Sequence, residues 1–410
     1  MAGSARDTEG YVIAGDGLRG IAALGIIAFH GFLGVFFLVA ERRPGVDWGP
    51  VGDVFVRMSV GLYVLLVLSG YLIGGPWVRA WLSGSEFPRP GAYVMRRVRR
   101  IMPAFWLVLA VTLLWFGSSG AGTRDVLALF GFGHIFIDGN AEFVLPQGWT
   151  LGVEFMFYLS VPLVAMLAVR AGSTRADPLR RRRVLLALLA VAFVVSFVVR
   201  VGPPETLERA GARTLAAFAW AFVPGLVLAA LEPAARLRLP GTREGRWLGL
   251  GLGALGLASV AALVLFDLDD GRVPTLLAYA GCGTGLVGGA LVWQWTTGTA
   301  PRVLTTRVAH ALGRWSYGIY LVHIGVGAEL VRRVPAGFGP AATLVFVLGG
   351  MLVGSVALAS LLWWLVERPA ITGRPPRRPG RRPPSADVRT PTGLSVAAVT
   401  PEAVPAPAAK

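Results

Sequence analysis

The chain has 410 residues, of which 54% are hydrophobic and only 15% are charged, and its mean hydropathy is +0.62. This balance excludes an ordinary soluble domain and predicts a polytopic membrane protein with an all-α fold. A net charge of +16 could suggest a nucleic-acid partner, but the basic residues lie in short runs between apolar stretches instead of on one basic face, which argues against such a partner.

Cys282 is the only cysteine in the sequence and lies within an apolar run. One cysteine cannot form a disulfide within the chain or a cysteine-based metal site. We therefore expect Cys282 to be a core residue, and we expect no metal centre.

Ten apolar segments are long enough, or nearly so, to cross a bilayer as helices, which takes about 20 residues each. They lie near 19–40, 59–77, 101–117, 149–170, 184–200, 214–231, 247–266, 273–295, 311–330 and 341–366. The first lacks a convincing cleavage site and predicts a signal anchor. A shorter apolar piece near 125–137 is broken by glycines and predicts a re-entrant or interfacial helix, with an eleventh crossing as the alternative.

The arginines orient these spans. With the N-terminus inside and ten spans, most of the 39 basic residues fall in predicted cytoplasmic segments, as the positive-inside rule requires. An eleventh crossing would place the four arginines at 180–183 outside, so ten spans with both termini cytoplasmic fit better. We expect a short cytoplasmic segment at 1–14, a membrane domain at 15–369, and a disordered Pro/Arg-rich cytoplasmic tail at 370–410.

The first span carries Asp16, Arg19 and His30. Eleven helical residues rise about 16 Å and complete nearly three turns, so Arg19 and His30 share one face, with Arg19 at the cytoplasmic rim and His30 near mid-membrane. Asp16 precedes Arg19 by three residues and is within ion-pair reach. Ionisable residues at this depth are costly and usually functional; the alternative for His30 is a structural hydrogen bond to a neighbouring helix.

Polar residues in the later spans predict further parts of a site. The pair Ser69-Gly70 is best explained by close helix packing. Arg97 and Arg100 fall on one helical face, before Pro103 can loosen the backbone, and such a fork suits phosphate groups, although positive-inside anchoring also explains them.

Two more spans carry ionisable residues. Glu154, with Tyr158 one turn later, lies toward the outer end of its span, where it is functional or part of a structural ion pair. His323 lies midway along 311–330, at a depth similar to that of His30, which predicts a site or supporting role.

Taken in order, these stretches resemble the acyltransferase 3 family of integral-membrane acyltransferases, which includes O-acetylases of bacterial surface polysaccharides and acyltransferases of macrolide sugars. The resemblance covers nearly all of 15–369. It rests on "DGLRGIAAL" followed by a histidine, "VLSGYLI", "RRVRRIMPAFW", "WTLGVEFMFY", "SYGIYLVH" and "ERP".

The resemblance implies which positions of this chain do the chemistry. The family's motif positions correspond to Asp16, Arg19, His30, Arg97, Arg100 and Glu154. Tyr63 and Phe155 stand where many members carry acidic residues, which weakens any inference about acceptor binding but leaves the histidine and the arginines intact.

The function implied is transfer of an acyl group, with acetyl as the commonest case, from acyl-coenzyme A to a hydroxyl of a carbohydrate or glycosylated metabolite. The enzyme would lie in the plasma membrane without a tightly bound cofactor, and its oligomeric state stays open. Arg97, Arg100 and Arg19 would hold the donor phosphates, and His30 would act as general base or take the acyl group covalently. The supporting or substrate-binding residues would be Asp16, Glu154, Tyr158 and His323.

Two other classes compete with an enzyme. A transporter or flippase would use buried His, Arg and Glu to relay protons or substrate, whereas a non-catalytic scaffold would leave the buried histidine without a reason. Transfer of a labelled acyl group separates the enzyme from both.

Overall fold

The computed structural model describes residues 13–373 except 138, 173–176, 203–212 and 267–272. The chain divides into two units, Met1–Arg374 and Pro375–Lys410. Most of the predicted cytoplasmic segment 1–14 and almost all of the predicted tail 370–410 lie outside the described residues, so the side on which the termini lie stays a prediction.

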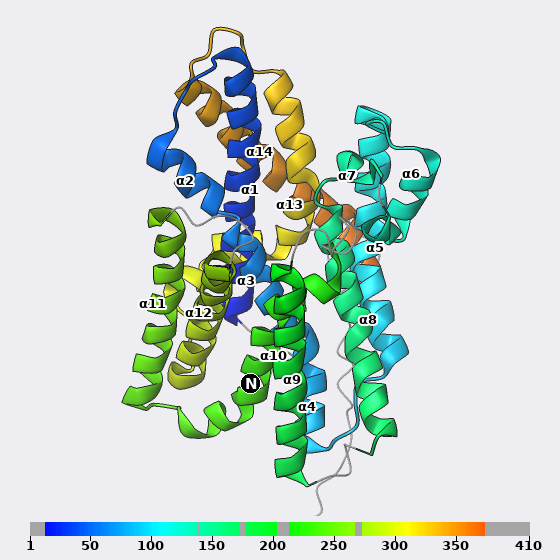
Figure 1. The fold of residues 1–410 in the computed structure, drawn as a ribbon, viewed down its shortest axis with the longest axis vertical. Coiled ribbons are helices and arrows are strands. Elements are labelled where there is room, and N and C mark those ends of the chain that lie inside the picture. The colour runs from blue at the N-terminus through cyan, green and yellow to red at the C-terminus, as the bar shows by residue number, and fades with distance from the viewer. Residues whose placement is uncertain (1–12, 138, 173–176, 203–212, 267–272, 374–410) are drawn as a thin grey trace, which may run out of the picture. The chain divides into compact units, whose positions relative to one another are not determined.

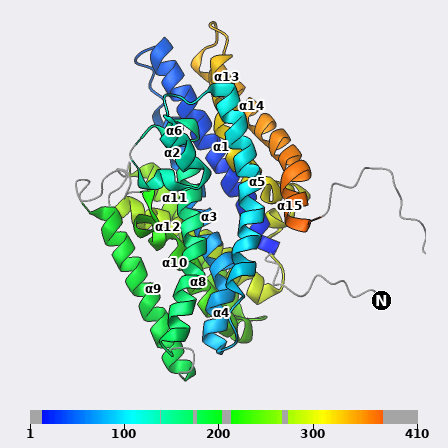
Figure 2. The same ribbon diagram turned by 90° about the vertical axis from the view of Figure 1, so that its right-hand side faces the viewer.

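Helices make up the ordered elements of the described chain (Figures 1 and 2). The first half contains α1 (Ile13–Arg42), α2 (Gly49–Arg57), α3 (Val60–Ser69), η1 (Gly70–Gly74), α4 (Gly75–Ser83), α5 (Pro90–Phe116), α6 (Thr123–Phe130), η2 (Gly133–Phe136), α7 (Ala141–Val144) and α8 (Gly148–Arg170). The second half contains α9 (Pro178–Val201), α10 (Leu215–Arg238), α11 (Arg243–Leu265), α12 (Val273–Thr297), η6 (Arg302–Thr305), α13 (Arg307–Arg332), α14 (Pro340–Leu362), η7 (Trp363–Glu367) and α15 (Arg368–Thr372).

Within the described ranges, nine helices are long and apolar enough to cross a membrane, and they correspond to nine of the ten predicted spans. The tenth, near 311–330, forms α13, whose 26 residues would span about 39 Å. Its composition is too polar to count with the nine, because Ser316, Tyr317, Tyr320 and His323 interrupt the apolar sequence. Ser316, Tyr317 and Tyr320 line the candidate site described below, and His323 contacts His30.

The segment near 125–137 is too short to cross a membrane. It forms the eight-residue helix α6 and the four-residue η2, and eight helical residues rise only about 12 Å. Figure 1 shows α6 and α7 beside one end of α5. The alternative of an eleventh crossing is therefore excluded here, and an interfacial or re-entrant position stays a prediction.

Small residues let α1 pack closely against α13. A Cβ atom at Gly313 would overlap the backbone of Asp16, and one at Gly20 would lie only 3.0 Å from the Ala309 carbonyl oxygen. Figures 1 and 2 both show α1, α13 and α14 side by side. This close approach brings the polar residues of α13 next to those of α1.

A second close approach joins η1 to α10. A Cβ at Gly70 would overlap the carbonyl of Phe222, and one at Gly225 would overlap that of Val67. The predicted packing role of the Ser69-Gly70 pair is therefore confirmed for Gly70. Here the long helix Gly49–Ser83 changes from α to π geometry over Gly70–Gly74, a local change that is frequent at functional sites.

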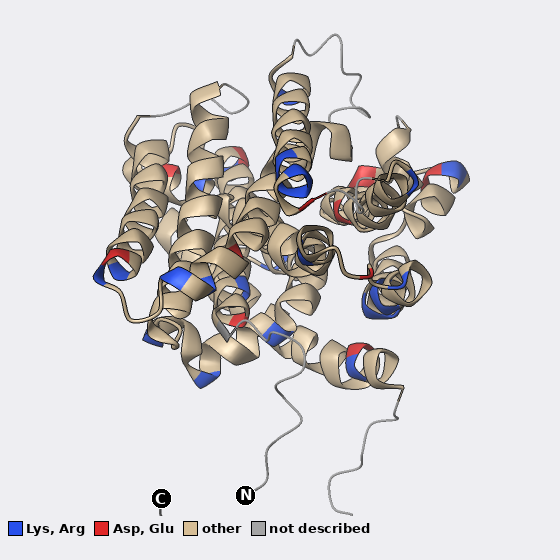
Figure 3. Ribbon diagram, turned by 90° about the horizontal axis from the view of Figure 1, so that it is seen from below, with Lys and Arg blue, Asp and Glu red and all other residues tan. Residues whose placement is uncertain are grey.

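Charged residues concentrate at the ends of the helices. Figure 3, which looks at the molecule from below, shows Lys and Arg at the near ends of several helices, with long tan stretches between. Charged ends around apolar middles are typical of membrane helices.

Candidate active site

A small cavity brings together polar residues from three of the predicted spans. Arg19 of α1, Arg97 and Arg100 of α5, and Glu154 and Tyr158 of α8 line a space of about 100 Å³. Pockets for whole organic ligands usually measure about 300–1,000 Å³, so this one admits only part of a large substrate. Three guanidinium groups against one carboxylate make this arginine cavity positive, and it suits an anionic group. Glu154 was predicted toward the outer end of its span, apart from the arginines, and this placement is wrong because it shares the cavity with them.

A hydroxyl group holds the Glu154 carboxylate within the arginine cavity. Ser69 Oγ donates to Glu154 Oε1 at 2.6 Å, and Tyr158 lines the same cavity. Sequence analysis assigned Ser69 to packing alone and missed this role. The feature that points to this role of Ser69 is its position as the last residue of α3, directly before the π-helical turn.

Arg97 is held by aromatic rings rather than by carboxylates. Its guanidinium carbon lies 5.6 Å from the ring centroid of Tyr93 and 5.8 Å from that of Tyr158, both within the range of cation–π attraction. In the part of the chain that the structure describes, its buried Nε has no hydrogen-bond partner. A buried donor without a partner is costly, and an anionic ligand in the cavity would satisfy it.

Asp16 positions Arg19, as the spacing predicts. Arg19 Nη1 lies 3.5 Å from Asp16 Oδ1. His310 Nδ1 lies 3.7 Å from the other carboxylate oxygen, so Asp16 joins the start of α1 to the start of α13. Asp16 is not among the residues that line the arginine cavity.

His30 lines a second, larger cavity of about 390 Å³. The two cavities share three lining residues: Leu62, Thr150 and Tyr320. Arg19 and His30, predicted to share a helix face, therefore lie on either side of a common wall. The hydroxyl groups of Thr150 and Tyr320 are hydrogen-bonded to each other in this wall, and they lie 2.9 and 3.3 Å from the Gln147 carbonyl oxygen. Because each hydroxyl has one hydrogen, one of them donates to that carbonyl and the other donates to its neighbour.

His323 contacts His30 directly. His323 Nε2 lies 3.2 Å from His30 Nδ1, and its own Nδ1 lies 2.8 Å from the Tyr320 carbonyl oxygen. His323 is completely buried, and 293 positions separate the two histidines in the sequence. The predicted alternative, a hydrogen bond from His30 to a neighbouring helix, thus exists, and it connects two residues that were each proposed for the site.

The geometry of this pair assigns the proton on each ring. A carbonyl oxygen can only accept, so His323 Nδ1 carries hydrogen and, in the neutral ring, Nε2 accepts. His30 Nδ1 must then donate to it, and the Ile26 carbonyl at 3.1 Å also favours hydrogen on that nitrogen. His30 Nε2 is left with a free lone pair, which is the form that a general base requires.

Glu367 is a buried carboxylate beside the site. It ends η7 and is 1% exposed, and neither carboxylate oxygen has a hydrogen-bond partner among the described residues. Arg100 acts on it electrostatically. Sequence analysis used it only within the motif "ERP", because a glutamate at the end of a span is also typical of an interface.

The two positions that depart from the family pattern hold aromatic contacts. Tyr63 stacks on Tyr279, with ring centroids 4.3 Å apart, and Phe155 packs against Phe132 at 5.5 Å. Cys282 is fully buried, as predicted. Across the described ranges, no group of three His, Cys, Asp or Glu residues is placed to hold a metal ion.

The acyltransferase domain model of the acyltransferase 3 family matches residues 13–360. The chain belongs to this family. It is therefore a membrane acyltransferase, and its apolar helices make it a multi-pass protein of the plasma membrane. The family resemblance drawn from the sequence motifs is confirmed.

Named relatives align over most of this acyltransferase. It is 28% identical to the exopolysaccharide production protein ExoZ of Rhizobium meliloti over 78% of this chain and 92% of ExoZ. It is 27% identical to the acyltransferase MdmB of Streptomyces mycarofaciens over 92% and 94% of the two chains. The peptidoglycan O-acetyltransferase OatA of Listeria monocytogenes is 24% identical over 79% of this chain and 50% of its own. No solved structure matches the chain.

Proposed function

We propose that this acyltransferase moves an acyl group, most simply acetyl, from acyl-coenzyme A to a hydroxyl of a carbohydrate or glycosylated metabolite. The observation that carries the proposal is the common wall between the positive cavity of Arg19, Arg97 and Arg100 and the cavity of His30. Relatives named for exopolysaccharide production and for O-acetylation of peptidoglycan support a carbohydrate acceptor. Family membership gives no support to the competing transporter or flippase.

The donor would reach His30 through this wall. Coenzyme A carries its phosphates at one end and the thioester at the end of a long flexible arm. Because the arginine cavity measures about 100 Å³, it would take a phosphate or a section of the arm, while the nucleotide stays outside. The free Nε of Arg97 and the planar fork of Arg100 suit a phosphate, and the thioester would pass Thr150 and Tyr320.

His30 would then act as general base. Its Nε2 takes the proton of the acceptor hydroxyl while the oxygen attacks the thioester carbonyl carbon. The carbon–sulfur bond breaks, and the leaving thiolate recovers the proton from His30 as free coenzyme A. His323 holds the ring in the required tautomer and orientation, as the third group of a catalytic triad does. An acyl-histidine intermediate at His30 is the alternative, and it would form in the absence of acceptor.

The test is transfer of a radiolabelled acetyl group by the purified enzyme in nanodiscs. Wild type should release coenzyme A and label an added glycan, whereas His30→Ala should do neither above background. Phe37→Ala is the matched control, because Phe37 is on the same helix but 66% exposed. Rejection of acetyl-coenzyme A by wild type with every acceptor would refute the donor, and full activity of His30→Ala would refute the general base. Label retained on the protein without acceptor would select the covalent route.

A further inference from the structure

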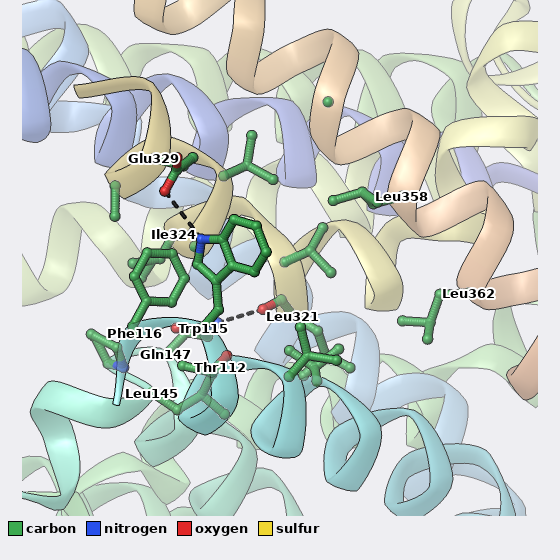
Figure 4. Close-up of a pocket in the computed structure, with 18 of the residues that line it drawn as sticks. Thr112, Trp115, Phe116, Leu145, Gln147, Leu321, Ile324, Glu329, Leu358 and Leu362 are labelled. Carbon is green, nitrogen blue, oxygen red and sulfur yellow. Dashed lines mark hydrogen bonds between the residues drawn. The ribbon is translucent and has the colours of Figure 1, made fainter. Parts of the chain in front are cut away.

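A long apolar groove lies between α5, α13 and α14. It encloses about 760 Å³, enough for a chain or ring system of substantial size. Figure 4 shows Trp115 and Phe116 of α5, Ile324 of α13, and Leu358 and Leu362 of α14 around it. Nothing in the mechanism above uses this groove.

The groove adjoins the cavity of His30. Phe143, Pro146, Gln147 and Ile324 line both spaces. None of these four residues lines the arginine cavity, which lies beyond Thr150 and Tyr320. The groove thus meets the cavity of His30 through residues other than those that separate this cavity from the arginines.

Gln147 carries an unsatisfied oxygen at this junction. The side chain is 3% exposed, and its Nε2 donates to the Leu321 carbonyl at 2.6 Å (Figure 4). Since that carbonyl can only accept, the amide nitrogen must face it, and Oε1 faces away. Within the described residues, Oε1 has no hydrogen-bond partner. An amide oxygen only accepts, so the missing partner is a donor such as a hydroxyl group.

The groove also has a charged rim. Glu329 Oε1 lies 2.6 Å from Arg333 Nη2, Glu329 Oε2 lies 3.8 Å from Arg332 Nη1, and Trp115 Nε1 donates to Glu329 at 3.3 Å. The groove therefore has apolar walls, a charged rim and one unsatisfied acceptor, Gln147 Oε1, where it meets the cavity of His30. These features match a ligand that is apolar along most of its length and carries a hydroxyl group at one end.

We propose that the groove binds the apolar part of an amphiphilic acceptor, a glycoside with an apolar aglycone. Its sugar would lie in the cavity of His30. One hydroxyl would donate to Gln147 Oε1, which leaves a neighbouring hydroxyl free to give its proton to His30 Nε2. This inference rests on the proposed function and narrows its acceptor class.

Binding can be tested without catalysis. The enzyme in nanodiscs is photolabelled with dodecyl β-D-glucoside that carries a diazirine in its chain, and the labelled peptides are mapped by mass spectrometry. Labels should fall on α5 and α14 around Val111 and Leu358, and an excess of plain dodecyl β-D-glucoside should remove them. Labelling elsewhere, or labelling removed equally well by phosphatidylethanolamine, would overturn the proposal and assign the groove to bilayer lipid.

Kinetics then tests the consequence for transfer. With wild type, the KM for dodecyl β-D-glucoside should be at least tenfold below that for methyl β-D-glucoside. Leu358→Trp fills the groove and should abolish this difference without changing the KM for the methyl glucoside. Val353→Trp, on the same helix but outside the groove and 70% exposed, should preserve it.

Two outcomes separate this inference from the proposed function. Groove labelling without any acyl transfer would refute the acyl-coenzyme A mechanism but keep the binding assignment. Transfer to both glucosides with equal KM would refute the groove and keep the mechanism. Gln147→Leu should raise the KM for both glucosides with little change in the KM for acetyl-coenzyme A; an unchanged glucoside KM would contradict the role of Gln147.

Discussion

At the scale of single residues, His323 determines which nitrogen of His30 carries hydrogen. His323→Leu removes the acceptor for His30 Nδ1, so the wrong tautomer becomes populated and the ring can rotate. We predict that kcat falls at least tenfold, about 1.4 kcal/mol of barrier, with the KM for acetyl-coenzyme A unchanged. His323→Gln offers an amide oxygen to the same Nδ1–H and should restore much of kcat. Equal loss in both variants would show that the ring is needed for packing alone.

His134 lies outside the membrane helices, and its prediction concerns stability. Burial, and to a lesser extent the charge of Arg213, lowers the pKa of His134 to about 4. The unfolded chain, with a pKa near 6.5, therefore takes up the proton first as the pH falls. Stability should be independent of this group above pH 6.5 and decrease between about pH 6.5 and 4, by about 3 kcal/mol in total.

This pH dependence is measured as Tm of the solubilised protein. The Tm of the His134→Phe variant should fall less than that of wild type between pH 7 and pH 4.5, because the substitution removes one group that binds a proton on unfolding. The same decrease in both proteins would mean that His134 does not contribute.

At the scale of elements, α5 carries two pairs of arginines that distinguish donor binding from topological anchoring. Arg97 and Arg100 line the cavity, whereas Arg96 and Arg99 do not. Replacing Arg97 and Arg100 together by lysine keeps the charge but loses the planar fork, so the KM for acetyl-coenzyme A should rise roughly tenfold, within the range of about 1–3 kcal/mol for a charge-assisted contact. The matched double variant Arg96→Lys, Arg99→Lys should leave that KM unchanged. If the two double variants change the KM for acetyl-coenzyme A equally, the arginines of α5 serve only to anchor the topology.

The elements also show what sequence can predict. Apolar length predicts ten spans, and nine of them match described helices that are long and apolar enough to cross a membrane. Helical spacing places Arg19 with Asp16 and puts Arg97 beside Arg100. The pairing of His30 with His323 was beyond such reasoning, because it depends on how closely Gly20 and Gly313 let α1 and α13 approach. Periodicity within one helix gives the face of a side chain but not the helix that it meets.

The same limit applies to the residues that sequence analysis missed. Ser69, Thr150 and Tyr320 are ordinary polar side chains in apolar helices, and only the packing of three helices makes them partners or walls of the cavities. α13 gave a partial signal, since Ser316, Tyr320 and His323 recur at helical spacing on one face. Gln147 gave none, because a glutamine just before a predicted span is typical of an interfacial loop.

At the scale of the whole molecule, the arginine distribution predicts cytoplasmic termini. Cys282 is buried, so single cysteines can be introduced with little background from it. Ser85→Cys, in the loop before α5, should react with a membrane-impermeant maleimide only after the cells are opened. Glu41→Cys, at the other end of α1, should react in intact cells. If Ser85→Cys reacts in intact cells and Glu41→Cys reacts only in opened cells, the topology is the reverse of the predicted one, and the arginine cavity lies on the outer side.

The central claim is that one donor molecule reaches from the arginines to His30. The most direct measurement is a cryo-EM structure of the enzyme in nanodiscs with a non-transferable acetyl-coenzyme A analogue. The account predicts a donor phosphate against Arg97 and Arg100, the arm passing between Leu62, Thr150 and Tyr320, and the acetyl carbonyl in the cavity of His30. An analogue bound elsewhere, with the arginine cavity empty and the wall of Thr150 and Tyr320 closed, would contradict it.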